Sequence, residues 1–253
     1  MSALTTAFVV FACCASSALA GMVLCIKVPD HHLDDDSKDV VKLVLGLVAT
    51  MVALVLGLLI ASANSSFNTQ STELRELTAN AMQLDHALAL YGPETREARD
   101  TFRQLVTAMH QRIWPADGSS TIAPDPSLSR DQVDAFYQQL KSLVPKTEAQ
   151  RGAQTTALDL GRALAQTRLL MFEQLDGSTS WPLLVVLVFW VSVLFLGFGL
   201  LAPLHTTNAV VLTIGALSVA GAIFLILELS QPYVGLIHVS DASVRNLLAG
   251  MGR

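Results

Sequence analysis

Residues 40–91 read VVKLVLGLVATMVALVLGLLIASANSSFNTQSTELRELTANAMQLDHALALY. The first half is long and apolar enough to cross the hydrocarbon of a bilayer. From Asn64 onward no Pro or Gly interrupts the chain before Gly92, so nothing breaks a helix there. Apolar residues recur at alternating three- and four-residue spacing, a heptad seam of Leu74, Leu77, Ala81, Leu84 and Leu88. We therefore predict one helix of 52 residues, about 78 Å long.

Three further segments are also long enough to span a membrane. The four predicted spans are Ala3–Ile26, Leu43–Ala63, Pro182–Pro203 and Ala209–Leu229. Only helices satisfy their own backbone polar groups in lipid, so the fold class is all-α. Ala18-Leu19-Ala20 resembles a signal-peptide cleavage site, but no Lys or Arg precedes the apolar stretch. We therefore expect the first span to be retained.

The charge distribution divides the chain into apolar parts and one charged part. Of 253 residues, 52% are hydrophobic and 15% are charged. Nineteen of the 21 acids and 14 of the 16 Lys and Arg lie between Lys27 and Asp176. The net charge of −5 argues against a nucleic-acid partner. Cys13, Cys14 and Cys25 all lie in the first span, so no disulfide framework is expected.

Positive charge predicts the orientation in the membrane. Four spans place both termini and the insert on one side, which carries 13 of the 16 Lys and Arg. This side is expected to be cytoplasmic. The loop 27–39 then lies outside, and its acids would raise the local cation concentration. The predicted acidic mouth consists of Asp34, Asp35 and Asp36.

The predicted domains are transmembrane helices 1 and 2 (1–63), a cytoplasmic helical domain (64–180), transmembrane helices 3 and 4 (181–230) and a C-terminal segment (231–253). Within the insert, helices are expected over Glu94–Trp114, Ser129–Val144 and Lys146–Leu175. The last of these also carries heptad spacing. The heptads can pack as an antiparallel pair within one chain, or around the axis of an oligomer.

Extended backward, the heptad seam enters the second span. Its outer part consists of the small residues Gly46, Ala49 and Ala53, which allow helices to approach closely. Its inner part consists of the bulky residues Leu56, Ile60 and Phe67. Around a symmetry axis these three would form an apolar constriction. The alternative is ordinary helix packing.

The sequence shows no catalytic constellation, and neither enzymatic activity nor a cofactor is expected. The run from Asp30 to Asp36 contains carboxylates and imidazoles, but a solvated acidic loop is the simpler interpretation, and no metal site is expected. Glu228 is the one acid within a span. An intramembrane carboxylate calls for a partner, although Glu228 could also reach the membrane interface.

Two stretches carry a family resemblance. The first is LVLGLLIASA (54–63), followed by SSFNTQ (65–70) and YGPETREAR (91–99). The second is ILEL (226–229), followed by QPY (231–233), GLI (235–237) and VS (239–240). Together they resemble the bestrophin-like membrane proteins of bacteria over nearly the whole chain. The relation to true bestrophins is more distant. Those are pentameric channels whose pore is lined by the second span and narrowed by an apolar neck.

The resemblance implies a homo-oligomeric ion channel, with a pentamer favoured, in a bacterial inner membrane. Its partners would be membrane lipid, further copies of the chain and permeant small ions. The acidic outer loop favours cations. The alternative is a membrane-anchored sensor or scaffold whose helical insert binds a protein partner.

Overall fold

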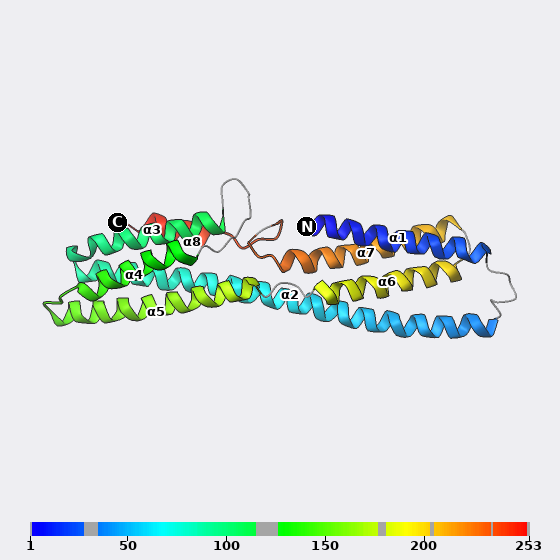
Figure 1. Cartoon of the computed structure of the whole chain (residues 1–253), viewed down its shortest axis with the longest axis horizontal. Helices are drawn as coiled ribbons and strands as arrows, with labels where there is room; N and C mark the ends of the chain where they lie inside the picture. Colours follow the sequence, from blue (N-terminus) through cyan, green and yellow to red (C-terminus); the bar gives the residue numbers. More distant parts are fainter. Residues whose placement is uncertain are drawn as a thin grey trace. The chain divides into compact units, whose positions relative to one another are not determined.

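A computed structural model describes residues 2–27, 35–114, 126–176, 181–202, 205–233 and 235–251 (Figure 1). Every regular element within these ranges is a helix, which confirms the predicted all-α class. The chain divides into two compact units. The membrane unit comprises Met1–Phe67, Ser178–Gln231 and Gly235–Ile237, and the insert unit comprises Asn68–Gly177, Pro232–Val234 and His238–Arg253.

Helix α2 (Asp35–Tyr91) contributes residues to both units and is 57 residues long. It begins five residues earlier than Val40, the predicted start. The predicted outer loop 27–39 is correspondingly shorter, because α1 extends to Lys27 and α2 begins at Asp35. Carboxylates near a helix N-terminus interact favourably with the helix dipole. The acidic run therefore starts the helix instead of extending the loop.

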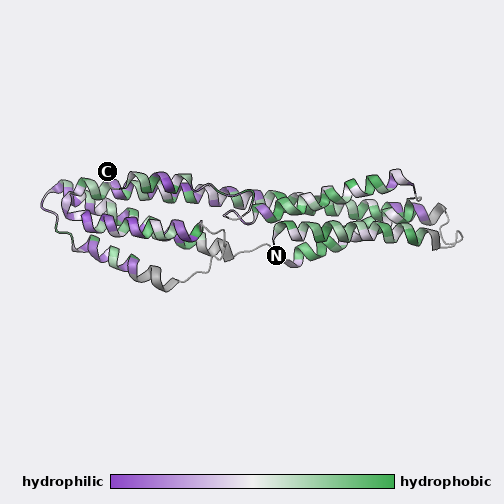
Figure 2. Ribbon diagram, turned by 90° about the horizontal axis from the view of Figure 1, so that it is seen from above, coloured by the Kyte–Doolittle hydropathy of each residue, from purple (hydrophilic) through white to green (hydrophobic). Residues whose placement is uncertain are grey.

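The membrane unit contains α1 (Ala3–Lys27), the first part of α2, α6 (Trp181–Leu201) and α7 (Thr206–Leu229). All four helices are long and apolar enough to cross a membrane, and Figure 2 shows their apolar colouring. α1 packs against α6 and α7. The shared core includes Val10, Cys14, Leu187, Val191 and Ile223, and Leu45 and Val52 of α2 join it.

Two glycines allow α1 and α6 to approach each other closely. A Cβ atom at Gly21 would collide with the backbone carbonyl of Leu196, and one at Gly199 would collide with the carbonyl of Ala18. Each glycine thus meets the backbone of the opposite helix. Small residues are the usual means of tight helix packing in a membrane, where apolar burial alone gives helices little reason to associate.

The insert unit is built from the second part of α2 and the shorter helices that follow it. These are η2 (Pro93–Thr95), α3 (Arg96–Ile113), α4 (Pro126–Ser142), α5 (Glu148–Asp176) and α8 (Ala242–Gly250). α4 begins at Pro126, three residues before the predicted Ser129, because Pro suits the first position of a helix. α8 lies in the C-terminal segment, for which no helix was predicted.

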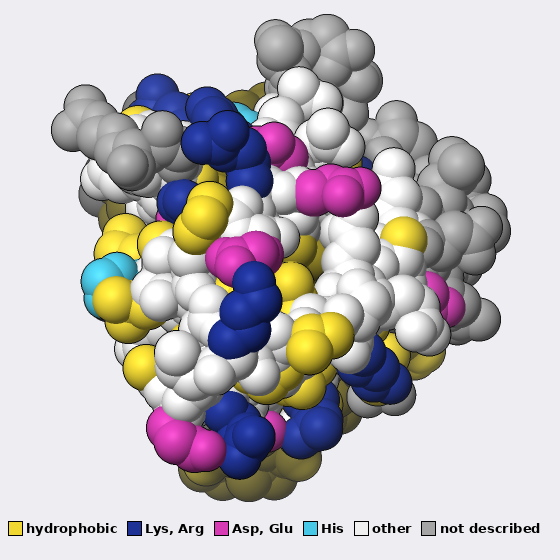
Figure 3. All heavy atoms as spheres, turned by 90° about the vertical axis from the view of Figure 1, so that its left-hand side faces the viewer, with side chains coloured by type: hydrophobic (Ala, Val, Ile, Leu, Met, Phe, Trp, Pro, Cys, Tyr) yellow, Lys and Arg dark blue, Asp and Glu magenta, His cyan; other side chains and the backbone are white. Residues whose placement is uncertain are grey.

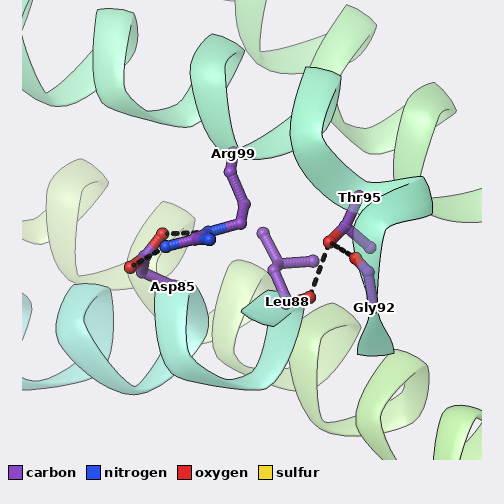
Figure 4. Close-up of polar contacts among 5 residues, drawn as sticks. All are labelled: Asp85, Leu88, Gly92, Thr95 and Arg99. Atoms are coloured by element: carbon purple, nitrogen blue, oxygen red, sulfur yellow. Dashed lines mark hydrogen bonds and ion pairs between the residues drawn. The ribbon is translucent and has the colours of Figure 1, made fainter. Parts of the chain in front are cut away.

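Within the insert unit, a sharp corner joins α2 to α3 (Figure 4). Gly92 has φ 127°, a backbone conformation that favours glycine. Thr95 Oγ1 lies 2.6 Å from Leu88 O and 2.8 Å from Gly92 O, so its one proton is shared between two carbonyls at the end of α2. Arg99 Nε and Nη2 donate to the two carboxylate oxygens of Asp85 at 2.8 and 2.9 Å. The hydrogen bonds that Arg99 donates to Asp85 raise the pKa of Arg99.

The C-terminal segment packs against α3 within the insert unit. Trp114 Nε1 donates to Val239 O at 3.2 Å, and His110 Nε2 lies 3.2 Å from Asp241 Oδ2. Val244, Leu247 and Met251 are buried there. The end of this unit drawn in Figure 3 carries Lys and Arg beside Asp and Glu, as in the Lys146–Glu94 ion pair at 3.7 Å.

Candidate functional site: the membrane half of α2

The membrane half of α2 is the span least covered by its own chain. Only 11% of its most apolar window is buried, compared with 28% for α1, 28% for α7 and 39% for α6. A helix of this composition is not left open to bulk water, so lipid, another protein surface or a narrow apolar pore must lie against it. The chain therefore presents a large unpartnered surface on this helix.

One face of α2 packs against the rest of the membrane unit. Leu45 and Val52 are buried in the core, and Val41, Val48 and Leu59 are partly buried against it. The other side is open, with Leu43, Leu47, Leu54 and Leu58 between 64% and 74% exposed. Gly46 and Gly57 have no neighbouring atom within 4 Å of a built Cβ. We call the side formed by Leu47, Thr50, Leu54, Gly57 and Ala61 the open strip.

The three residues predicted to form the constriction lie beside the open strip. Leu56, Ile60 and Phe67 are each partly buried. Leu56 packs against the core of the membrane unit, whereas Ile60 and Phe67 lie outside that core cluster. A single chain thus leaves part of each side chain accessible. The seam and the open strip are two neighbouring candidates for the surface that faces a pore.

The predicted seam changes character along α2. In the insert unit Leu74, Leu77, Ala81, Leu84 and Leu88 are at most 5% exposed within the single chain. In the membrane unit Gly46 and Ala53 are exposed, Ala49 is partly buried and Ala63 is buried. The heptad surface of the insert is therefore occupied by the chain's own helices. Part of the seam remains open only in the membrane half.

The predicted acidic mouth is only partly described. Asp34 lies outside the described residues, while the backbone of Asp35 and Asp36 forms the first turn of α2. Across the ranges that the structure describes, no group of three or more His, Cys, Asp or Glu is placed to hold a metal ion.

Glu228, the acid predicted within a span, is 5% exposed and lies in the last turn of α7. Its partners are backbone groups: Oε1 accepts hydrogen bonds from the N–H of Leu236 and, at 3.2 Å, from the N–H of Ile237. A Cβ atom at Gly235, where φ is 109°, would collide with the same carboxylate. Sequence reasoning identified Glu228 but missed this partner, because local spacing gives no sign that a loop folds back.

Tyr233 lies in the insert unit and is 6% exposed, with its ring edge against Trp114 at 5.9 Å between centroids. Burial, and secondarily the charge of Glu73, raise the pKa of Tyr233. Its hydroxyl has no hydrogen-bond partner among the described residues.

Comparison with known proteins identifies the family. The sequence model of the Bestrophin-like domain matches residues 12–244, whereas no curated protein gives a significant match. Among solved structures, a bacterial bestrophin homologue from Klebsiella pneumoniae, carrying a point mutation, superposes with a TM-score of 0.58 at 14% identity. The match covers 95% of this chain and 98% of that one. The fold is shared, and the chain belongs to the Bestrophin-like domain family.

Proposed function

We propose that the chain is one subunit of a homo-oligomeric ion channel whose pore is lined by α2. The observation that carries the proposal is the low coverage of α2, with 11% of its apolar window buried. Lipid could cover such a helix, but the open strip also contains Thr50, Gly57 and Ala61. Small and weakly polar side chains favour a close approach to other helices or to a narrow pore over a purely lipid environment. The likeness to bestrophins supports a pentamer.

The constriction that we propose consists of Leu56, Ile60 and Phe67. Bulky apolar side chains around a narrow axis expel water and thereby oppose ion passage. Ile60→Ala should therefore raise the current of purified protein in planar lipid bilayers severalfold. The matched control is Leu217→Ala on α7, which removes a 63% exposed side chain. The proposal would be abandoned if the reconstituted protein never conducted and Ile60→Ala changed nothing.

A cysteine-block experiment can decide whether the open strip or this constriction lines the pore. Single cysteines at Leu54, Ile60 and Val185 would be tested for block of the current by a water-soluble methanethiosulfonate reagent. Val185 lies on α6 and is 59% exposed, so it should be silent. Block at Ile60 supports the constriction proposed from the sequence, whereas block at Leu54 alone assigns the pore to the open strip.

The heptad surface keeps the sensor or scaffold alternative open. Because Leu74, Leu84 and Leu88 are buried within one chain, the insert does not need an oligomer to cover its heptads. A monomeric or dimeric native mass, combined with capture of a protein partner by the insert, would favour this second function.

We further propose a bacterial inner membrane location with the insert cytoplasmic, on the basis of the Lys and Arg distribution. A C-terminal green fluorescent protein fusion should fluoresce, and a C-terminal alkaline phosphatase fusion should be inactive. The reverse pattern would invert the orientation.

A further inference from the structure

The short loop Gly235–Ile237 returns to the membrane unit after the last span. It is held there by the buried carboxylate of Glu228, which accepts the backbone N–H groups of Leu236 and Ile237. Gly235 is required at the turn for two reasons. Its φ of 109° would strain any other residue, and a Cβ atom there would collide with the carboxylate of Glu228. The three residues therefore form a defined structure that belongs to the membrane helices.

The same loop presents apolar side chains outward. Leu236 is 78% exposed, the most exposed large hydrophobic residue in the described ranges, and Ile237 is 37% exposed. The backbone N–H groups of Leu236 and Ile237 are thus hydrogen-bonded, while the side chains of these two residues remain uncovered. In water that arrangement would be unfavourable, because apolar surface is better removed from water.

The loop lies at a membrane boundary. Its acceptor Glu228 is the penultimate residue of α7, which ends at Leu229. Trp181 is 51% exposed and begins α6, the preceding antiparallel span, so it marks the same boundary. Trp is enriched at membrane–water interfaces. One turn before Glu228, Leu225 is 43% exposed on the surface of the span. Both Leu225 and the loop thus expose apolar side chains at this end of α7.

The backbone N–H groups of the loop explain why the carboxylate of Glu228 lies at the end of α7. Unpaired N–H groups cannot enter the apolar part of a bilayer without a large penalty. A buried carboxylate is equally unfavourable there unless it is partnered. The contact between Glu228 and the loop satisfies both requirements at once. Such a pairing allows a non-helical segment to lie close to the hydrocarbon without unpaired backbone N–H groups.

We propose that Gly235–Ile237 is an interfacial lipid anchor, with Leu236 and Ile237 inserted at the headgroup–acyl boundary of the leaflet in which α7 ends. The occupant of this surface is lipid. The anchor does not depend on ion conduction, so its test stands apart from that of the proposed channel.

The test is a spin label at Leu236→Cys, in a background with Cys13, Cys14 and Cys25 replaced by Ala, in phosphatidylethanolamine–phosphatidylglycerol liposomes. Its accessibility is measured to oxygen, which concentrates in the bilayer, and to a water-soluble nickel chelate. Leu225→Cys, near the end of α7 and 43% exposed, is the lipid control, and Val144→Cys, 77% exposed in the insert unit, is the aqueous control. We expect the Leu236 label to match Leu225. Behaviour like Val144 would overturn the anchor.

Shielding from both reagents would also overturn it, since a second copy of the chain would then cover the loop. A cysteine-independent measurement guards against a damaged background: a photoreactive benzophenone residue at position 236 should crosslink to lipid. Adducts of two chains in place of lipid adducts would count against the proposal.

Glu228 provides the matched perturbation. Glu228→Ala removes the acceptor, and we expect the Leu236 label to shift to the accessibility of Val144. Glu228→Gln keeps one acceptor oxygen and should give an intermediate value. An unchanged label in Glu228→Ala would show that the carboxylate does not hold the loop at the membrane.

Discussion

At the residue scale, several of the residues that carry the family resemblance fix the turns of the chain at helix ends. Gly92, Thr95 and Arg99 make the corner between α2 and α3. Glu228 and Gly235 fix the loop after the last span. These positions depend on backbone conformation and hydrogen bonding more than on apolar burial. The motifs at 91–99 and 226–240 thus describe how the chain turns at helix ends, whereas the motif at 54–70 lies within α2, on which the channel proposal rests.

Arg99→Ala should lower the stability of the insert unit. The variant leaves Asp85, whose side chain is 14% exposed, without its two-pronged partner, and hydrogen bonds to charged groups contribute about 1.5–3 kcal/mol. The control is Arg162→Ala, whose ion pair with Asp159 is 71% and 62% exposed and should contribute less than about 1 kcal/mol. Thermal unfolding followed by circular dichroism should show a clearly lower midpoint for Arg99→Ala only. Equal midpoints would mean that the two hydrogen bonds between Arg99 and Asp85 do not contribute to the stability of the insert unit.

Tyr233→Phe should be neutral or stabilising by up to about 1 kcal/mol, because it removes a buried hydroxyl that lacks a described partner. Trp114→Phe is the comparison, since it deletes the hydrogen bond to Val239 O and should destabilise by about 1 kcal/mol. Both are measured as unfolding midpoints in detergent. A marked loss of stability in Tyr233→Phe would reveal a partner for the hydroxyl.

At the element scale, helix packing in the membrane unit depends on shape, because every span is apolar on all sides. Gly21 and Gly199 set how closely α1 and α6 approach, while Leu45 and Val52 set which side of α2 faces inward. In the insert unit the buried side of α2 follows the heptads.

Gly199→Leu should separate α1 from α6, since the new side chain would collide with the backbone of Ala18. Overpacking of this kind costs about 1–3 kcal/mol. Gly221→Ala on α7 is the control, as no atom lies within 4 Å of a Cβ built there. Size-exclusion profiles of a fluorescent fusion should show loss of the folded peak for Gly199→Leu alone. A wild-type profile would argue against the close approach.

Leu84→Asp places a charge at a fully buried position of α2, since Leu84 is 0% exposed. An unpaired buried charge is strongly destabilising, by several kcal/mol. Met82→Asp, two residues away at a 52% exposed site, should be tolerated. Helicity and elution volume report both variants. Unchanged behaviour of Leu84→Asp would contradict the burial of the seam.

The sequence predicted the helices well and the open surface of α2 poorly. Hydropathy located the four long apolar helices, because the apolar and the charged parts of the chain differ in composition. Heptad spacing predicted a packing seam from Leu74 to Leu88, and these residues are buried within the single chain. The open strip could not be predicted, since Leu54 and Leu56 are equally apolar and only packing against other spans distinguishes them. The backbone partners of Glu228 could not be predicted from the sequence either, because their position depends on a backbone turn at Gly235. The start of α2 at Asp35 was missed because acids suit both loops and helix N-termini.

At the scale of the whole molecule, the membrane protein is two units that share one helix. Each unit has its own core, and the membrane unit keeps an uncovered surface on α2. That surface is where further copies would bind if the chain forms a channel.

Native mass spectrometry of the protein released from nanodiscs should give five copies of the 27.1 kDa chain, about 136 kDa before bound lipid is counted. This mass tests the proposed pentamer, and in the proposed channel a particle image along the membrane normal should show the α2 helices nearest the axis. A monomeric or dimeric mass at all protein concentrations would refute the assembly.

The packing of α1 against α6 and α7 has a consequence for biosynthesis. Residues 28–180 separate α1 from α6 in the chain. At about 5–20 residues per second, a ribosome needs roughly 8–30 s to translate that interval. During this time the surface around Gly21 has no permanent neighbour, and the nascent first helix must wait in the insertion machinery or in lipid. Nascent chains stalled before Trp181 should therefore be vulnerable to quality-control proteases, and those stalled after α7 should be protected.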